Sequence, residues 1–272
     1  MPETVRAEVR FVNPEWRGRS EIPQIYSKEL RYANTSVHQV EIQDARPLLE
    51  RGELDLDRHG FTLVEHHSRA AGFGEEGEFG KDYLEEMEQL IRQVAGADET
   101  FMFNEATVRA ANPKTFFGDG YALYFHTDYS DRLRASNERE LLAKANSPLL
   151  DDASGWGFAW YNLWRPANGE VEQNPLALID ASSLDPHDLV PYGLDPDNKT
   201  VSMLPLFSSG QRVFYFSRMR NHEVLIFKQA DSRRNTAKVC PHTSFRIPDA
   251  PDNARRRRSV EARFMCAFAP KD

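Results

Sequence analysis

From residue 121 onward, the chain is a succession of short apolar and aromatic runs that Gly, Pro, Asn and Asp residues separate. Such runs, bounded by turn formers, are typical of β-strands. They lie at residues 121–126, 160–164, 176–180, 201–206, 212–216, 223–227 and 260–268. Many short strands at regular spacing favour a closed or sandwiched all-β architecture. We therefore expect a mainly β protein with a double-stranded β-helix (jelly-roll, cupin-like) core and flanking α-helices.

The first half of the chain carries fewer strand signals. Residues 37–42, 60–64 and 101–109 are strand candidates, whereas residues 1–35 are polar and rich in turn formers, so we expect them to wrap around the body. Residues 81–94 are the best helix candidate. Their apolar side chains recur at helical spacing before a glycine stop: Tyr83, Met87, Leu90, Ile91 and Val94, followed by Gly96.

The chain has 272 residues with no internal repeat and no low-complexity linker. We expect one domain over residues 1–272, with a charged, alanine-rich helical insertion at about 131–158. A hydrophobic share of 40% can fill a sizeable core. The net charge of -8 and the pI of about 5.6 argue against nucleic acid as the main partner, because phosphate binding needs a basic surface.

The cysteine content and the hydropathy of the chain indicate its cellular compartment. Two cysteines in a chain of this length, Cys240 and Cys266, do not make a disulfide framework. No apolar stretch approaches the length that a membrane helix needs, and the N-terminal residues lack a basic-then-apolar signal pattern. We expect a soluble, cytoplasmic protein with reduced thiols and no membrane partner.

The strongest local signal for chemistry is Phe125-His126-Thr127-Asp128. On an extended strand, residues two apart face the same side, so His126 and Asp128 can approach one ion together. His242, far along the chain and just before the last β run, can supply a third ligand. Two histidines and one carboxylate on one face leave positions open for a cosubstrate and O2, as in non-haem Fe(II) oxygenases. We predict that His126, Asp128 and His242 bind Fe(II).

A basic segment leads into the last predicted strand. In an extended chain, alternate side chains there share one face. That face carries Arg257, Ser259, Glu261 and Arg263. An arginine and a serine two residues apart can bind a carboxylate through the guanidinium and the hydroxyl, and 2-oxoglutarate has a distal carboxylate that needs such a clamp. We favour Arg257 with Ser259 as this clamp, with Arg263 as the second candidate; Glu261 can pair with Arg263 or Arg165.

Other residues are weaker candidates for the pocket. Asn162 and Trp164 share a face of the strand at 160–164, and with Arg165 they can contact the cosubstrate or the substrate. A core tryptophan with a capping arginine explains these residues equally well. Tyr215 can line the substrate pocket, although an aromatic run at 214–216 is more simply core packing.

These motifs recur in a fixed order that resembles a known family. The matching pieces are Phe125 to Asp128, Asn162 to Pro166, Pro175 to Ser183, Phe214 to Phe216 with Met219, His222 to Lys228 with Asp231 and Ser232, His242 with Phe245, and Arg257 to Arg263. Over roughly residues 36–270 the chain resembles the asaB hydroxylase/desaturase family, which includes the hydroxylase component of cephamycin 7α-methoxylation. It departs from the family's Asp-His-Thr-Val-Arg-like strand, which here reads Asn104 to Arg109.

The resemblance implies a 2-oxoglutarate-dependent Fe(II) dioxygenase of secondary metabolism that uses O2 to hydroxylate or desaturate a small molecule. Asp128 argues against halogenation, because its carboxylate fills the position that a halide would need. A second hypothesis is a cupin-like protein that binds Zn(II), Ni(II) or a small molecule without oxidative turnover. A third, a nucleic-acid-associated protein that uses the arginines at 255–258, is opposed by the acidic charge.

Overall fold

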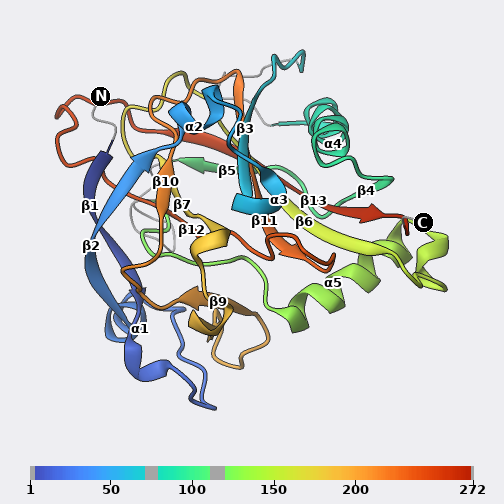
Figure 1. The fold of residues 1–272 in the computed structure, drawn as a ribbon, viewed down its shortest axis with the longest axis horizontal. Helices are drawn as coiled ribbons and strands as arrows, with labels where there is room; N and C mark the ends of the chain where they lie inside the picture. Colours follow the sequence, from blue (N-terminus) through green and yellow to red (C-terminus); the bar gives the residue numbers. More distant parts are fainter. Residues whose placement is uncertain (1–3, 71–78, 111–119, 271–272) are drawn as a thin grey trace.

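A computed structural model describes residues 4–70, 79–110 and 120–270, and its strands form two large sheets and a hairpin (Figure 1). The five-stranded sheet has the order β1 (Thr4–Val12), β2 (Thr35–Asp44), β10 (Val213–Tyr215), β7 (Leu176–Ile179) and β12 (His242–Ser244). The six-stranded sheet has the order β3 (Phe61–Glu65), β11 (Glu223–Asp231), β6 (Gly157–Pro166), β13 (Arg258–Phe268) and β4 (Glu99–Met102), with β5 (Thr107–Ala110) also on β13. The hairpin joins β8 (Leu189–Gly193) to β9 (Val201–Pro205).

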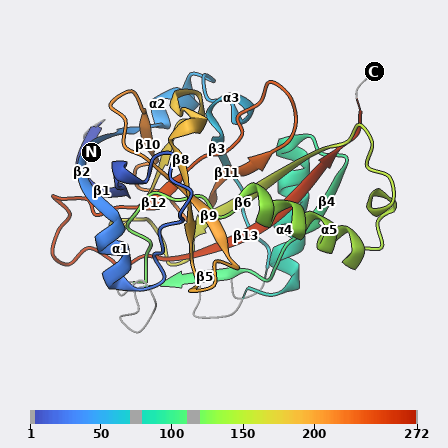
Figure 2. The same cartoon turned by 90° about the horizontal axis from the view of Figure 1, so that it is seen from below.

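Helices flank this β core. The two longest are α4 (Lys81–Ala95) and α5 (Asp131–Lys144), and both lie at the end of the molecule where β4 and β13 are found, away from β1 and β2 (Figures 1 and 2). The shorter helices are α1 (Lys28–Asn34), α2 (Arg46–Glu50) and α3 (Leu56–His59). The 3₁₀ turns are η1 (Pro14–Trp16), η2 (Pro148–Leu150), η3 (Ala181–Ser183) and η4 (Pro186–Asp188).

The outer face of the six-stranded sheet packs against α4. This helix buries one stripe of side chains at helical spacing, and Gly96 ends it in the left-handed conformation with φ 64°. Alternate residues of β6 and β13 meet that stripe because successive side chains of a strand point to opposite faces. The cluster includes Tyr83, Met87, Ile91, Tyr161, Leu163, Val260, Ala262 and Phe264.

The inner face of the six-stranded sheet packs against the five-stranded sheet. Phe61, Trp164 and Phe227 contribute from the larger sheet, while Leu178 and Phe214 face them from the smaller one. Apart from the parallel pair of β2 and β10, the named strands of both sheets run antiparallel. Two such sheets that bury apolar faces against each other make the sandwich of a jelly roll. The expected double-stranded β-helix fold with flanking helices is therefore confirmed, and its inner faces also carry the polar site described below.

Several predicted elements are confirmed and others need correction. The helix at 81–94 and the strands at 37–42, 60–64, 160–164, 176–180, 201–206, 212–216, 223–227 and 260–268 match observed elements within a few residues. The expectation that residues 1–35 only wrap the body is wrong. Residues 4–12 form β1, whose buried Val5, Ala7, Val9 and Phe11 alternate with polar residues, so its overall composition hides a half-buried strand.

Two further strand predictions are corrected. The candidate at 101–109 is two short strands, β4 and β5, which pair with successive parts of β13. The run at 121–126 is not a strand. It follows an irregular path that two isolated bridges hold, one from Tyr124 to Arg10 and one from His126 to His242. Within the described ranges, no helix is long and apolar enough to cross a membrane.

A buried ion pair braces β11. Lys228 Nζ lies 2.6 Å from Asp231 Oδ2, and both side chains have no exposed surface. Breaking a buried pair leaves an uncompensated charge, which costs about 3 kcal/mol or more. We therefore expect Lys228→Met to lower the free energy of unfolding by about 3 kcal/mol in urea titrations.

The exposed pair of Lys81 and Glu85 provides the control, with side chains 85% and 52% exposed. An exposed pair contributes little, so Lys81→Met should change the same free energy by less than about 1 kcal/mol. Equal losses for the two variants would contradict the assignment of a stabilising role to the buried pair.

Candidate metal centre

Backbone pairing brings the two predicted histidine ligands together. The His126 N–H donates to the His242 carbonyl at 3.0 Å, and the His242 N–H donates to the His126 carbonyl at 2.9 Å. Two residues that exchange both hydrogen bonds in this antiparallel manner lie directly opposite each other, with their side chains on the same face. The ring centroids are 4.4 Å apart. His242 begins β12, where it also pairs with Leu178 of β7, so the five-stranded sheet fixes its position.

Both imidazoles have their Nδ1 atoms turned toward carbonyl oxygens. His126 Nδ1 lies 2.9 Å from the Tyr124 carbonyl, and His242 hydrogen-bonds the Cys240 carbonyl. A carbonyl only accepts, so these contacts assign the proton to Nδ1 and leave the Nε2 lone pair free. A metal-binding histidine commonly uses this arrangement to fix its tautomer and orientation.

Asp128 completes the set of ligands. One ligand atom from each of His126, Asp128 and His242 can be chosen so that all three lie within 4.8 Å of one another. Asp128 Oδ2 accepts from Asn162 Nδ2 at 2.6 Å and lies 3.2 Å from Arg263 Nη2. The other oxygen, Oδ1, lies 3.9 Å from His126 Nε2. Neighbouring groups thus hold one carboxylate oxygen while the other faces the histidines.

Electrostatics keep the three ligands in their metal-binding protonation states. Burial opposes ionisation of Asp128, but the Arg263 guanidinium holds its pKa well below the usual range. Burial lowers the pKa of His126, and burial followed by the neighbouring His126 lowers the pKa of His242 to about 3. At neutral pH the site therefore offers one carboxylate and two neutral imidazoles, the forms that bind a metal.

The depressed histidine pKa values predict a pH-dependent stability of the metal-free protein. When the chain unfolds, each imidazole returns to a pKa of about 6.5. Below that pH the unfolded state takes up protons that the folded state rejects, so the free energy of unfolding falls as the pH falls. We expect a loss of about 1 kcal/mol per ring for each pH unit below about 6.5.

Urea titrations of apo protein between about pH 7.5 and about pH 5.5 would measure this loss. His242→Gln removes one titrating ring and should flatten the decline. Unchanged stability across this pH range would contradict the prediction.

A buried cationic patch, formed by Arg257 and Ser259, lies beside the histidines, and some of its hydrogen-bond donors lack partners among the described residues. Arg257 packs between two aromatic rings, 4.3 Å from the Tyr121 centroid and 5.0 Å from the Trp164 centroid. Its Nη1 donates to the Asn174 carbonyl, but its Nε has no partner among the described residues. The buried Ser259 hydroxyl likewise lacks a partner there. Burial lowers the pKa of Arg257 to about 10, so it stays charged at neutral pH.

Two adjacent buried donors without partners fit a missing acceptor. Burying a polar group without a hydrogen bond is costly, and a guanidinium beside a hydroxyl suits a carboxylate. Arg263 is already engaged, because it pairs with Glu261 at 2.7 Å as well as with Asp128. Of the two arginines predicted as the clamp, Arg257 is therefore the one with a donor available for a carboxylate.

The triad and Arg257 line a small cavity. Its lining comprises Arg109, Gly120, Tyr121, Ala122, His126, Asp128, Trp164, Leu176, His242, Ser244, Arg257, Glu261 and Arg263. Polar and charged side chains dominate the lining, with Trp164 and Leu176 as its main apolar surfaces. The cavity thus places an anion-binding patch beside three candidate metal ligands.

Two of the predicted pocket residues lie elsewhere. Arg165 follows Trp164 on β6 and so faces the opposite side, where it donates to the carbonyls of Asn221 and His66. Tyr215 lies in the apolar cluster on the far side of the five-stranded sheet, with its ring 5.5 Å from Phe245. Neither lines the cavity, and we withdraw both as binding residues.

Two other polar residues at the site were not predicted. Arg109 lines the cavity from β5, directly opposite Ser259 of β13. Gln229 contacts two of the candidate ligating residues. Residues 104–109 depart from the corresponding strand of the resembled family, but Thr107, Val108 and Arg109 agree with it, and this partial agreement was the signal for Arg109. No sequence pattern pointed to Gln229.

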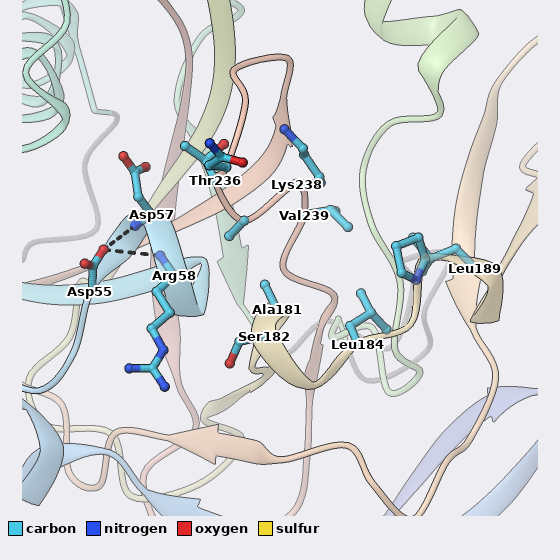
Figure 3. Close-up of a pocket in the computed structure, with 13 residues that line it drawn as sticks. Asp55, Asp57, Arg58, Ala181, Ser182, Leu184, Leu189, Thr236, Lys238 and Val239 are labelled. Carbon is cyan, nitrogen blue, oxygen red and sulfur yellow. Dashed lines mark hydrogen bonds between the residues drawn. The ribbon is translucent and has the colours of Figure 1, made fainter.

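A second, larger cavity has a volume of about 450 Å³ and lies apart from the triad (Figure 3). Helix α3, the turns near Ala181 and the segment at 235–239 line it, and none of the three candidate ligands does. Figure 3 shows the Asp55 carboxylate bonded to the backbone of Asp57 and Arg58, so it caps α3. This cavity does not offer the donor set that the smaller one does.

Comparisons with known proteins agree with the site. Residues 10–267 match the family described as "Oxidoreductase/YMDC permease-like domain". The Fe(II)/2-oxoglutarate-dependent dioxygenase nvfI of Aspergillus novofumigatus is 29% identical over 95% of each chain. The hydroxylase/desaturase asaB of Aspergillus flavus is 30% identical over 172 residues, which cover 57% of this chain and 75% of that one.

The fold is similar to a solved structure of the same kind. The iron and alpha-ketoglutarate-dependent endoperoxidase NvfI superposes with a TM-score of 0.81 at 26% identity, over 100% of this chain and 99% of that one. The family match covers nearly the whole described chain, and the resemblance to asaB is confirmed. The protein therefore belongs to this oxidoreductase family, and it is similar to Fe(II)/2-oxoglutarate-dependent dioxygenases and to the hydroxylase/desaturase asaB.

Proposed function

We infer that the protein is an Fe(II)/2-oxoglutarate-dependent dioxygenase that hydroxylates or desaturates a small molecule of secondary metabolism. The observation that carries this function is the convergence of His126, Asp128 and His242 beside the unpartnered donors of Arg257 and Ser259. One set suits a divalent metal with open positions, and the other suits the distal carboxylate of a keto acid. The dioxygenase names of the relatives support the same activity.

In this proposal each side chain of the site has a distinct role. His126 and His242 present neutral Nε2 atoms, and Asp128 presents the oxygen that Arg263 leaves free. Arg257 and Ser259 bind the distal carboxylate of 2-oxoglutarate, which directs its keto acid end toward the three ligands. When bound, Fe(II) supplies the redox chemistry that couples O2 reduction to oxidation of both cosubstrate and substrate.

The hydroxylation consumes one O2 and one 2-oxoglutarate for each substrate molecule. Substrate R–H, O2 and 2-oxoglutarate give R–OH, succinate and CO2, with one oxygen atom in the alcohol and one in succinate. In a desaturation the substrate loses two hydrogens and the second oxygen leaves as water. Trp164 and Leu176 form the apolar part of the cavity wall and keep bulk water from the reacting groups.

Succinate formation tests this function. Purified protein with Fe(II), ascorbate and 2-oxoglutarate should consume O2 and form succinate slowly without substrate, and faster with a substrate. Replacing Fe(II) by Zn(II) should stop both. Metal binding without any succinate would instead favour the cupin-like protein without oxidative turnover, which the relatives do not support.

Further parts of the proposal concern the whole chain. We propose that residues 1–272 act as one domain, because the site draws on β5, β6, β12 and β13 and on the segment at 126–128. We also propose a cytoplasmic location and no nucleic-acid partner. Cell fractionation and a salt-dependent DNA-binding assay would test these two statements.

A further inference from the structure

Strand β11 contains a β-bulge next to the candidate metal centre. Its pairing with β6 runs in order to Lys228, opposite Tyr161, and resumes at Ala230, opposite Trp160. Gln229 is therefore the extra residue that has no partner across the ladder. Bulges are over-represented next to active sites, where they redirect a side chain.

The buried ion pair described above is a consequence of this bulge. Lys228 and Asp231 are three residues apart, and in an unbroken strand such residues face opposite sides. Here both face outward, with Lys228 Nζ 2.6 Å from Asp231 and 2.5 Å from Asp57. The pair can form only with the extra residue in place, so it holds the bulge in its register.

The bulge turns the Gln229 side chain toward the ligating residues. Gln229 Oε1 accepts from the Asp128 N–H at 2.8 Å. Gln229 Nε2 donates to the Lys228 carbonyl at 3.1 Å and to the carbonyl of Cys240, two residues before His242, at 3.4 Å. Because the Asp128 N–H can only donate, it fixes which end of the amide is the oxygen. The side chain is almost fully buried, with 1% of its surface exposed.

We propose that Gln229 is a positioning residue of the metal centre, which holds Asp128 through its backbone N–H and His242 through the Cys240 carbonyl. Asp128 lies on an irregular segment and His242 on β12, and Gln229 links both to the six-stranded sheet through one amide. This inference rests on the proposed metal site. Outer partners of metal ligands fix ligand orientation, and their loss lowers metal affinity about 10- to 100-fold.

Cobalt binding by apo protein tests the proposal without turnover. Anaerobic Co(II) titrations, followed by the d–d absorption of the ion, would give a dissociation constant for wild type, Gln229→Met and Gln229→Asn. Methionine keeps the length but loses the hydrogen bonds of the amide, and asparagine keeps the amide but is too short to reach the same partners. We expect each variant to bind Co(II) about 10- to 100-fold more weakly, with a changed d–d spectrum. Gln93→Met on the exposed face of α4 is the matched control and should bind as wild type does.

The outcomes separate this inference from the function itself. If wild type fails to bind Co(II), the proposed metal site fails. If wild type binds and a folded Gln229 variant binds equally well with the same spectrum, only the positioning role fails. Melting curves of the apo proteins identify folded variants, and failure of both variants to fold would assign Gln229 to fold stability and overturn the proposal.

Discussion

Replacement of His126 by alanine is expected to abolish specific Fe(II) binding and, with it, 2-oxoglutarate-dependent succinate formation. The imidazole is one of three candidate ligands that the described residues bring together, and its Nε2 atom lies 3.9 Å from Asp128 Oδ1. Loss of a ligand should weaken metal binding by more than the roughly 100-fold that loss of an outer partner can cause. Anaerobic Fe(II) titrations of the variant and wild type would measure the difference.

The control for this experiment is His187→Ala, in an exposed turn far from the cavity lining. It should bind Fe(II) as wild type does. Equal Fe(II) affinity in His126→Ala and wild type would remove the metal assignment and leave a β-rich protein with a polar cavity.

Arg257→Ala is expected to raise the KM for 2-oxoglutarate about 100-fold while leaving Fe(II) affinity nearly unchanged. A hydrogen bond to a charged group contributes about 1.5 to 3 kcal/mol. Loss of about 3 kcal/mol from the clamp corresponds to roughly 100-fold in binding. Arg257→Lys keeps the charge but not the planar fork, so it should recover only part of the loss.

Two neighbouring arginines give the comparisons. Arg258 is the next residue, where its guanidinium lies 5.3 Å from the Phe79 ring, so Arg258→Ala should leave the KM nearly unchanged. Arg263→Ala should weaken metal binding first, because Arg263 holds Asp128. If Arg257→Ala leaves the KM unchanged and Arg263→Ala raises it, the clamp would have to be reassigned to Arg263.

Strand periodicity explains why much of the site was predictable. Alternation along residues 257–263 places Arg257, Ser259, Glu261 and Arg263 on one face. In the structure Arg257, Glu261 and Arg263 line the cavity, and Ser259 is buried on the same strand. His126 and Asp128 were predicted to share a strand face. They do converge, although the segment that carries them is irregular. Hydrogen bonds to the His242 backbone and to the Gln229 side chain hold this segment.

The errors arise where tertiary pairing decides the outcome. Arg165 is one residue from Trp164, and a shift of one residue moves a side chain to the opposite face. Tyr215 lies in the apolar cluster on the far side of the five-stranded sheet, because its neighbours Phe214 and Phe216 pack between the two sheets. Gln229 was missed because a bulge is a property of two paired strands, and no composition or spacing along one strand reports it.

His126 and His242 are far apart in the sequence but directly opposite each other in the fold, so a metal ion bound by both side chains would act as a reversible cross-link. An ion bound to both side chains would close the long loop between them, which includes α5, β6, β7, β10 and β11. The unfolded chain has no such preformed site, so the ion stabilises the folded state by mass action. Iron supply in the cell would therefore set the lifetime of this protein as well as its turnover, because iron-poor cells would hold a chain that opens, and is degraded, more readily.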